Sequence, residues 1–175
     1  MKKQFVIAAL VALFAAVVAF SGAVRPTAAV AAGPGASANG HGTILVTNTK
    51  GKTVRRQFSF SAKQMPDGTV QGSAVLHNPE FDPRYDAQFK ITCLQVVGNR
   101  ASFGGSIRKT SDAAFNDEFD AAFFTVYDNG EPGKGVDTIS LVSFDNVVEP
   151  SSCQFIGAND FVQYPVEAGN VQVKP

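Results

Sequence analysis

The chain has 175 residues, of which 45% are hydrophobic, and its 15 Lys and Arg residues balance its 15 Asp and Glu residues. The basic residues form no cluster larger than adjacent pairs such as Arg55 and Arg56. This charge pattern argues against binding to nucleic acid and to anionic membrane surfaces.

Residues 1–31 have the order of a secretory signal peptide. Lys2 and Lys3 precede an apolar run from Phe5 to Phe20, and small residues follow it. The run is shorter than the roughly 20 residues that a membrane-spanning helix needs. Cleavage is expected after Ala23 or, preferably, after Ala31. The sequence therefore predicts a secreted, extracellular or periplasmic protein with no stable membrane anchor after cleavage.

The mature chain is expected to be one domain of mildly acidic character. Lys2, Lys3 and Arg25 leave with the signal peptide, so 12 of the 15 basic residues remain beside all 15 acidic ones. Residues 32–42 are small, polar and aperiodic, which predicts a flexible lead-in. The domain is then expected to run over residues 43–175, a length that suffices to bury a core.

Alternation of apolar and polar residues predicts strands through the first half of the domain. Residues 43–49, 54–62 and 69–77 fit this pattern, and the Pro66-Asp67-Gly68 turn predicts that the last two form a hairpin. Residues 85–97 form the clearest strand, which we expect to point Tyr85, Ala87, Phe89, Ile91 and Cys93 inward.

The second half continues with strands at short intervals. Residues 101–109 contain Gly104 and Gly105, which suggest a bulge or a bend. A short helical turn is expected within 111–122, and strands are expected at 122–128, 138–144 and near 153–156, 161–165 and 170–173. The fold predicted is all-β, as a single antiparallel β-sandwich or up-and-down β-barrel of about eight to nine strands with at most one short helix.

Cys93 and Cys153 are the only cysteines in the chain. An even pair in an exported protein predicts a disulfide rather than a metal or redox site. Two separate buried thiols are the alternative.

Three segments of the chain are typical of one family of proteins: CLQVVGNRASFGG at 93–105, DNGEPGKGVDTISL at 128–141 and GNVQVKP at 169–175. They resemble post-choice-of-anchor domains, a family of small bacterial secreted modules found alone or appended to anchored surface proteins. The resemblance covers most of residues 42–175 and implies an extracellular β module. It implies no activity and no catalytic or binding residues.

The loop after residue 127 is the candidate metal site. Asp128, Asn129, Glu131 and Asp137 concentrate the oxygen ligands that Ca²⁺ takes in proteins. The spacing does not match an EF-hand, and Asn-Gly followed by Pro-Gly is also what a strand connection needs. A calcium loop and a plain turn therefore both remain open, and no other cofactor is expected.

Other polar residues suggest weaker candidates. His77, Glu80, Asp82 and Asp86 form a polar cluster with one imidazole, which is fewer than metal sites of that type contain. Glu118 and Asp120 are paired carboxylates of the kind that glycosidases use for catalysis. No feature of the sequence predicts that they lie across a cleft from each other.

Catalysis is not expected. The only histidines are His41 in the lead-in and His77 at the end of a strand, and there is no G-x-S-x-G motif.

The sequence supports two functions of different classes. The first is a secreted, non-enzymatic cell-surface or extracellular binding or structural module, with an unknown extracellular protein or envelope component as its partner. The alternative is a lipocalin-like carrier of a small apolar ligand, because the Phe residues of the expected domain, 12 of the 15 in the chain, would line a barrel if they do not fill it. The chain has no Trp and three Tyr, Tyr85, Tyr127 and Tyr164, which disfavours sugar binding by ring stacking.

Overall fold

A computed structural model describes residues 35–48, 50–80, 85–111, 119–131, 136–146 and 161–175, together with Cys153 and Ile156. This described part contains ten β-strands and no α-helix, which confirms the predicted all-β class. The strands are β1 (Ser37–Thr47), β2 (Thr53–Gln64), β3 (Val70–Asn78), β4 (Tyr85–Val97), β5 (Arg100–Thr110), β6 (Ala121–Tyr127), β7 (Thr138–Ser140), β8 (Ser143–Asp145), β9 (Gln163–Pro165) and β10 (Ala168–Lys174). The predicted signal peptide lies outside the described residues.

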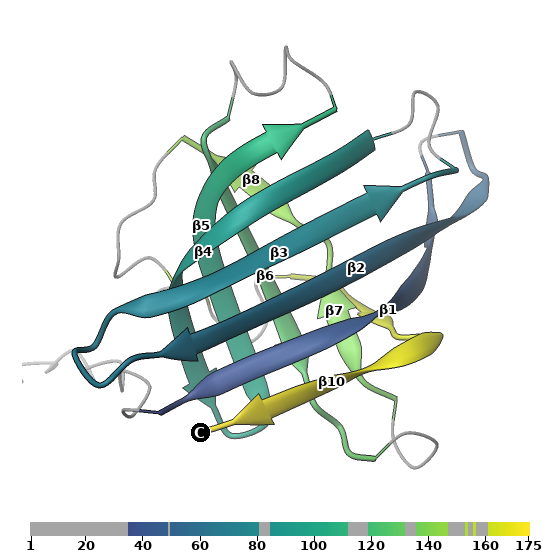
Figure 1. The fold of residues 1–175 in the computed structure, drawn as a ribbon. Coiled ribbons are helices and arrows are strands. Elements are labelled where there is room, and N and C mark those ends of the chain that lie inside the picture. The colour runs from purple at the N-terminus through teal and green to yellow at the C-terminus, as the bar shows by residue number, and fades with distance from the viewer. Residues whose placement is uncertain are drawn as a thin grey trace, which may run out of the picture.

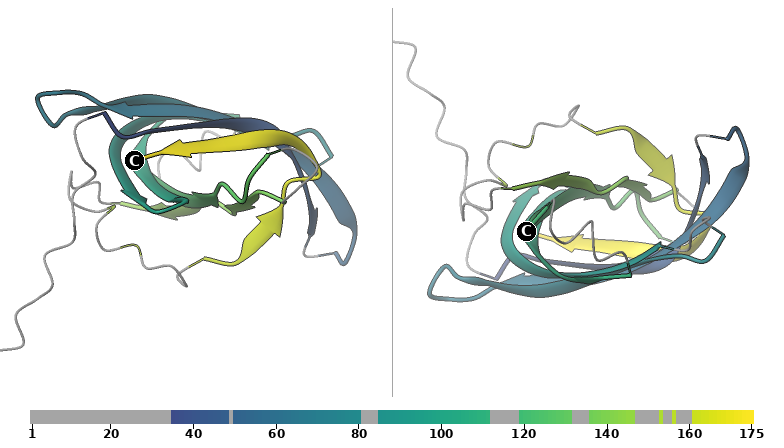
Figure 2. Two further views of the ribbon diagram at one scale, coloured as in Figure 1. Left: turned by 90° about the horizontal axis from the view of Figure 1, so that it is seen from below. Right: turned by 90° about the horizontal axis from the view of Figure 1, so that it is seen from above.

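The strands form one antiparallel sheet in which most neighbours are consecutive in the chain. Its order is β10-β1-β2-β3-β4-β5-β6-β7-β9, and β8 pairs with β6 (Figure 1). The end-on views show that the sheet curls, so that the layer of β10, β1, β2 and β3 lies over the layer of β6, β7 and β8 (Figure 2). The fold is a curled half-barrel made from a single sheet.

A bulge bends the sheet where β4 and β5 join the two layers (Figure 2). The register shifts between Ile91 and Cys93, opposite Gly105 and Gly104. A β-carbon at Gly104 would lie 2.6 Å from the sulfur of Cys93, and one at Gly105 would lie 2.0 Å from the carbonyl oxygen of Lys90. The predicted bulge at these glycines is confirmed, and only glycine fits there because the two strands approach so closely.

The predicted lead-in is wrong for residues 37–42. β1 begins at Ser37, and these residues pair with β2 on one side and β10 on the other. A β-carbon at Gly40 would lie 2.7 Å from the ring of Phe60. The glycines that made this segment look flexible are instead positions where an aromatic ring packs against strand backbone. His41, expected in the lead-in, lies exposed on β1.

The space between the layers is filled by aromatic side chains. Phe103 and Phe124 stack with their ring centroids 4.5 Å apart, and the ring of Phe60 lies 5.0 Å from Phe103 and 5.6 Å from Phe124. Ala87, Phe89, Ile91 and Cys93 are all buried, as their alternation predicts. Burial of these rings from β2, β5 and β6 holds the two halves of the curled sheet together.

Two other predicted elements differ from the structure or lie outside the described residues. The strand expected over 138–144 is divided into β7 and β8, with a break at Leu141 and Val142. The helical turn expected within 111–122 falls mainly on 112–118, which lie outside the described residues.

Candidate functional site

Asp128 and Asp137, two of the predicted calcium ligands, flank the connection between β6 and β7 and reach the C-terminal strand. The two carboxylate oxygens of Asp137 accept hydrogen bonds from the backbone N–H groups of Asn129 (2.9 Å) and Val171 (2.7 Å). Those of Asp128 accept from the N–H groups of Gly130 (3.1 Å) and Val173 (3.0 Å). Both aspartates therefore bind alternate N–H groups along the edge of β10 that does not pair with β1.

The same region of the molecule connects the two ends of the curled sheet. β9 pairs with β7 and β10 pairs with β1, so the short connection at Val166 and Glu167 passes from one end of the sheet to the other. Val166 donates its N–H to the carbonyl of Asp137, and Glu167 donates its N–H to the carbonyl of Thr43. Charged side chains that cover a free strand edge also prevent other chains from pairing with it.

The other two predicted calcium ligands lie beside this closure. The side-chain amide of Asn129 donates to the carbonyl of Val136 (2.9 Å), and Glu131 is exposed. Asp128, Gly130 and Glu131 face β10 across an open cleft of about 270 Å³. Among the residues that the structure describes, no three His, Cys, Asp or Glu side chains are grouped so that they could hold a metal ion. The calcium loop stays a prediction, whereas the role of Asp128 and Asp137 in holding β10 is visible in their hydrogen bonds.

Of the second polar cluster, His77 and Asp86 come together. They lie directly opposite each other on β3 and β4, with 2.5 Å between the His77 Nδ1 and Asp86 Oδ1 atoms. The Glu80 carboxylate instead accepts the backbone N–H of Arg55 (3.0 Å), and Asp82 lies outside the described residues. Both side chains of the pair are about one third exposed, so it is a partly solvated cross-strand pair on the surface of the sheet.

The predicted disulfide is confirmed. Cys93 of β4 and Cys153 are bonded, with their α-carbons 5.8 Å apart, and both are buried. Of the carboxylate pair considered for catalysis, Asp120 is exposed next to β6, and Glu118 lies outside the described residues.

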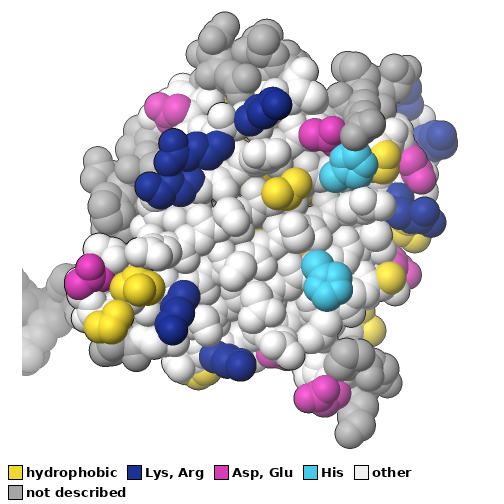
Figure 3. Space-filling model, in the orientation of Figure 1, with side chains coloured by type: hydrophobic (Ala, Val, Ile, Leu, Met, Phe, Trp, Pro, Cys, Tyr) yellow, Lys and Arg dark blue, Asp and Glu magenta, His cyan; other side chains and the backbone are white. Residues whose placement is uncertain are grey.

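The solvent-facing side of β10, β1, β2, β3 and β4 forms a broad surface, which we call the outer face. Its centre is formed by polar side chains other than Lys, Arg, Asp and Glu, together with Val75: Asn39, His41, Gln57, Ser59, Ser61, Ser73, Gln88, Asn170 and Gln172. Figure 3 shows this wide area almost free of Lys, Arg, Asp and Glu, which gather towards its margins.

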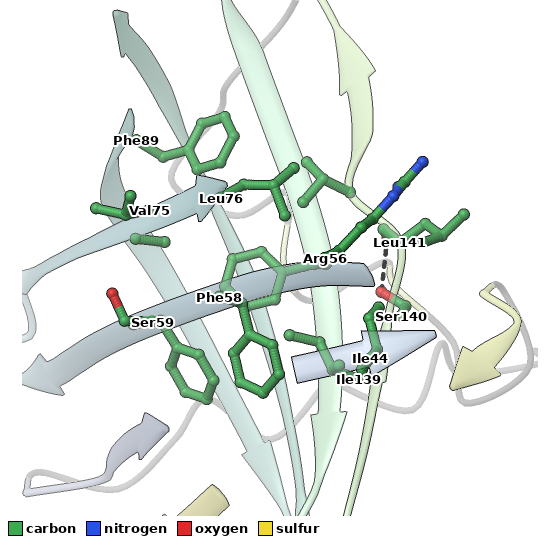
Figure 4. A pocket seen from close by; sticks show the side chains of 14 residues that line it. Ile44, Arg56, Phe58, Ser59, Val75, Leu76, Phe89, Ile139, Ser140 and Leu141 are labelled. Atoms are coloured by element: carbon green, nitrogen blue, oxygen red, sulfur yellow. Dashed lines mark hydrogen bonds between the residues drawn. The ribbon is translucent and has the colours of Figure 1, made fainter. Parts of the chain in front are cut away.

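The space between the layers contains a slot. Phe58, Leu76 and Phe89 line it from one layer, Ile139 from the other, and Leu141 and Val142 from the break between β7 and β8 (Figure 4). The slot is partly open to solvent, and its cavity volume is only about 20 Å³. This volume corresponds to about one water molecule.

Arg56 is the residue of this slot that sequence reasoning missed. Arg55 and Arg56 look like one surface pair in the sequence, but Arg56 has the inward position between the buried Val54 and Phe58. Burial lowers the pKa of the Arg56 guanidinium, and the nearby Tyr164 of β9 has the opposite effect. The alternation of inward and outward residues along β2 predicts that the Arg56 side chain points inward.

Comparison with models of protein families, with curated proteins and with solved structures finds no significant match to this chain. In the described part of the chain, no helix has the length and apolar character needed to cross a membrane.

Proposed function

We propose that this protein is a secreted, non-enzymatic extracellular module that binds an extracellular protein or an envelope component through its outer face. In this proposal, residues 1–31 direct export and the half-barrel acts outside the cytoplasm. A kinship with post-choice-of-anchor domains belongs to the same proposal, because those domains are extracellular modules.

The composition of the outer face is the observation that carries this proposal. Gln172, Asn39, Ser61 and Ser73 stand directly opposite one another on four adjacent strands, so they form a straight row of hydrogen-bonding groups. A second row contains Asn170, His41, Ser59 and Gln88, and Val75 lies between Ser59 and Gln88 in this row. Adjacent strands are about 4.8 Å apart, which gives a regular array of donors and acceptors on a broad surface.

A partner that binds such a face replaces the hydrogen bonds between its side chains and water with direct hydrogen bonds. The net gain for each such exchange is small, about 0.5–1.5 kcal/mol, because water already satisfies the same groups. Useful affinity therefore requires a large contact area or many copies on a shared matrix. An extracellular module meets that requirement by binding a repetitive or extended partner.

The small volume of the slot between the layers favours this function over a carrier that encloses its ligand. Binding pockets for small molecules usually have about 300–1,000 Å³. The phenylalanines that would line such a pocket instead pack against each other, as the stacked Phe103 and Phe124 do. Asp137 and Asp128 accept hydrogen bonds from backbone N–H groups of β10, which is a structural role.

The test is sedimentation of the purified mature protein with washed cells of its own host. We expect saturable binding that Ser61→Glu, in the centre of the outer face, weakens at least fivefold. Ser143→Glu places the same charge at an exposed position of β8 in the other layer and should bind as the unmodified protein does. No sedimentation, or equal loss in both variants, would contradict the proposal.

A further inference from the structure

The outer face carries a positive charge that is not evident from the order of residues in the sequence. Among the residues of β10, β1, β2, β3 and β4, the only acidic one is Asp86, which is paired with His77. Exposed basic side chains on the same strands are those of Arg55, Lys63, Lys90 and Lys174. Figure 3 shows Lys and Arg side chains around the margin of the polar centre. The outer face therefore attracts anions, although the mature chain as a whole is expected to be mildly acidic.

This charge arises because the two halves of the domain differ in composition. Residues 43–110 contain 10 basic and 4 acidic residues, whereas residues 111–167 contain 1 basic and 11 acidic residues. Most of β1 and all of β2, β3, β4 and β5 come from the first range. Because most neighbours in the sheet are consecutive in the chain and the sheet curls once, the basic half of the sequence forms the layer that presents the outer face (Figure 2).

The two rows of side chains across the outer face each end at a lysine. The row that contains Ser61 continues to Lys90 of β4, and the row that contains Ser59 continues to the exposed Lys109 of β5. Groups within a row recur at the strand spacing of about 4.8 Å, and four such spacings, about 19 Å, separate β10 from β4. Each row is therefore a straight line of hydrogen-bonding groups with a cation at one end.

We propose that the outer face binds an extended polysaccharide that carries carboxylate groups, with its chain lying across the strands along these rows. This inference rests on the proposed function, because it names the partner of the same face. The strand spacing is close to the length of one sugar ring in an extended chain, so successive sugars contact successive strands. Sugar hydroxyl groups bond to the Ser, Asn and Gln side chains, and carboxylates bond to the lysines. Such binding uses hydrogen bonds and charge rather than the ring stacking that the sequence disfavours.

The outer face suits a polysaccharide better than a protein or a nucleic acid. The centre of a protein–protein interface is usually apolar, whereas Val75 is the one apolar side chain in the two rows. DNA carries a negative charge about every 1.7 Å. Lys174 and Lys63, by contrast, lie two strands apart, about 10 Å, with Ser37 between them. A sparsely charged chain that is rich in hydroxyl groups matches both properties.

Three polymers separate the effect of charge from the effect of the sugar. They are polygalacturonate, its fully methyl-esterified form, and polyglutamate, which has carboxylates but no sugar rings. In calorimetric titrations of the full mature protein, we expect polygalacturonate to bind at least tenfold more tightly than either of the others and to bind more weakly as salt is added. Among galacturonate oligomers, affinity should rise with length up to about five sugars, which span β10 to β4, and then change little.

Substitutions of exposed residues test where the polysaccharide lies. Ser61→Glu should weaken polygalacturonate binding and Ser61→Lys should strengthen it, because the two changes place opposite charges in the middle of one row. Lys90→Gln should weaken binding about threefold, the size expected for one exposed ion pair. Lys52→Gln removes the same charge from the exposed turn before β2 and should leave binding unchanged.

Three results would overturn this inference. They are no binding of polygalacturonate, equal binding of polygalacturonate and either other polymer, and effects of the same sign in Ser61→Glu and Ser61→Lys. If polygalacturonate does not bind while Ser61→Glu still weakens sedimentation with cells, the proposed function stands and the class of partner is wrong. If polygalacturonate binds as expected but the protein does not sediment with cells, the proposed function is wrong and the binding chemistry of the face stands.

Discussion

Adjacent residues on a strand of this protein face entirely different surroundings. Arg55 is exposed to solvent, whereas Arg56, one residue later, lines the slot between the layers. Just before β7 begins, Asp137 is only 6% exposed, whereas its neighbour Val136 is exposed. The chemical role of a charged side chain in this fold is therefore set by the strand position that it occupies.

The buried carboxylate of Asp137 is expected to stabilise the fold without calcium. Asp137→Asn keeps the shape but leaves one oxygen for two N–H donors, those of Asn129 and Val171. A buried donor left without an acceptor costs about 1–3 kcal/mol, and we expect that loss in urea unfolding, with and without calcium.

The control for this prediction is Glu131→Gln, which neutralises an exposed acid of the same loop. It should unfold as the unmodified protein does. If calcium raised the stability of the unmodified protein and Glu131→Gln removed that effect, the loop would be a calcium site.

The Asp67 carboxyl should titrate at an unusually low pH. Its pKa is lowered chiefly by the hydroxyl of Thr69, which donates a 2.6 Å hydrogen bond, and further by the Thr69 backbone N–H at 2.9 Å. Since the pKa is lower in the folded state, the carboxylate stabilises the turn above its unfolded pKa, and that contribution is lost as pH falls through the folded pKa. Thr69→Val should raise the Asp67 pKa, as measured by NMR titration of its carboxyl carbon.

An exposed threonine elsewhere provides the comparison for Asp67. Thr53→Val, at the start of β2, should leave the Asp67 titration unchanged. An unaltered Asp67 pKa in Thr69→Val would show that the hydroxyl bond is not formed in solution.

At the scale of the element, β1 shows how small residues form a strand. Ala36 and Ala38 are fully buried, and Gly40 lies against the ring of Phe60. Residues 37–42 of this strand lack the β-branched residues that usually indicate a strand, so their pairing depends on the partners on both sides. Its strand character follows from tertiary packing rather than from local propensity.

Gly40→Ala tests whether β1 begins before Thr43. An added methyl group would meet the Phe60 ring at 2.7 Å, and we expect a loss of about 1–3 kcal/mol in the free energy of unfolding. In a flexible lead-in the same change would have no effect or would stabilise slightly. Asn39→Ala, at the exposed neighbouring position, should change stability by less than about 0.5 kcal/mol. A Gly40→Ala variant as stable as its parent would show that residues 37–42 are not part of the sheet.

Elements were predictable from sequence where one face of a strand is apolar. β2, β3 and β4 alternate clearly, and turn chemistry at Pro66-Asp67-Gly68 sets the hairpin between β2 and β3. The break between β7 and β8 was not predicted, although the adjacent apolar residues Leu141 and Val142 shift the alternation of 138–144 from one phase to the other at that point. The hydrogen bonds between Asp128 and β10 and between Asp137 and β10 join residues that are 45 and 34 positions apart in the chain. No local sequence pattern predicts such contacts.

At the scale of the whole molecule, the disulfide ties the bend of the sheet to a distant segment. Cys93 and Cys153 are 60 residues apart, and Gly104 lies directly against the Cys93 sulfur. On the chain-entropy account, closing a loop of that length stabilises the folded state by about 4 kcal/mol.

Cys93→Ser is therefore expected to lower the free energy of unfolding by about 4 kcal/mol in urea titrations. Dithiothreitol should destabilise the unmodified protein by a similar amount and should leave the variant unchanged. Two free thiols in the untreated protein, with an unfolding midpoint that dithiothreitol does not move, would show that the bond is absent in solution.

The pairing of β1 with β10 also sets the order in which this protein can fold. A strand made among the first residues of the domain obtains its second neighbour only when residues 168–174 are present, and the aspartates at 128 and 137 obtain their N–H partners at the same moment. A ribosome or an export channel delivers the chain from its N-terminus, so the half-barrel remains incomplete while its last strand is still in transit. Completion of the fold consequently waits until residues 168–174 have emerged, and in the proposed secretory route it takes place on the far side of the membrane.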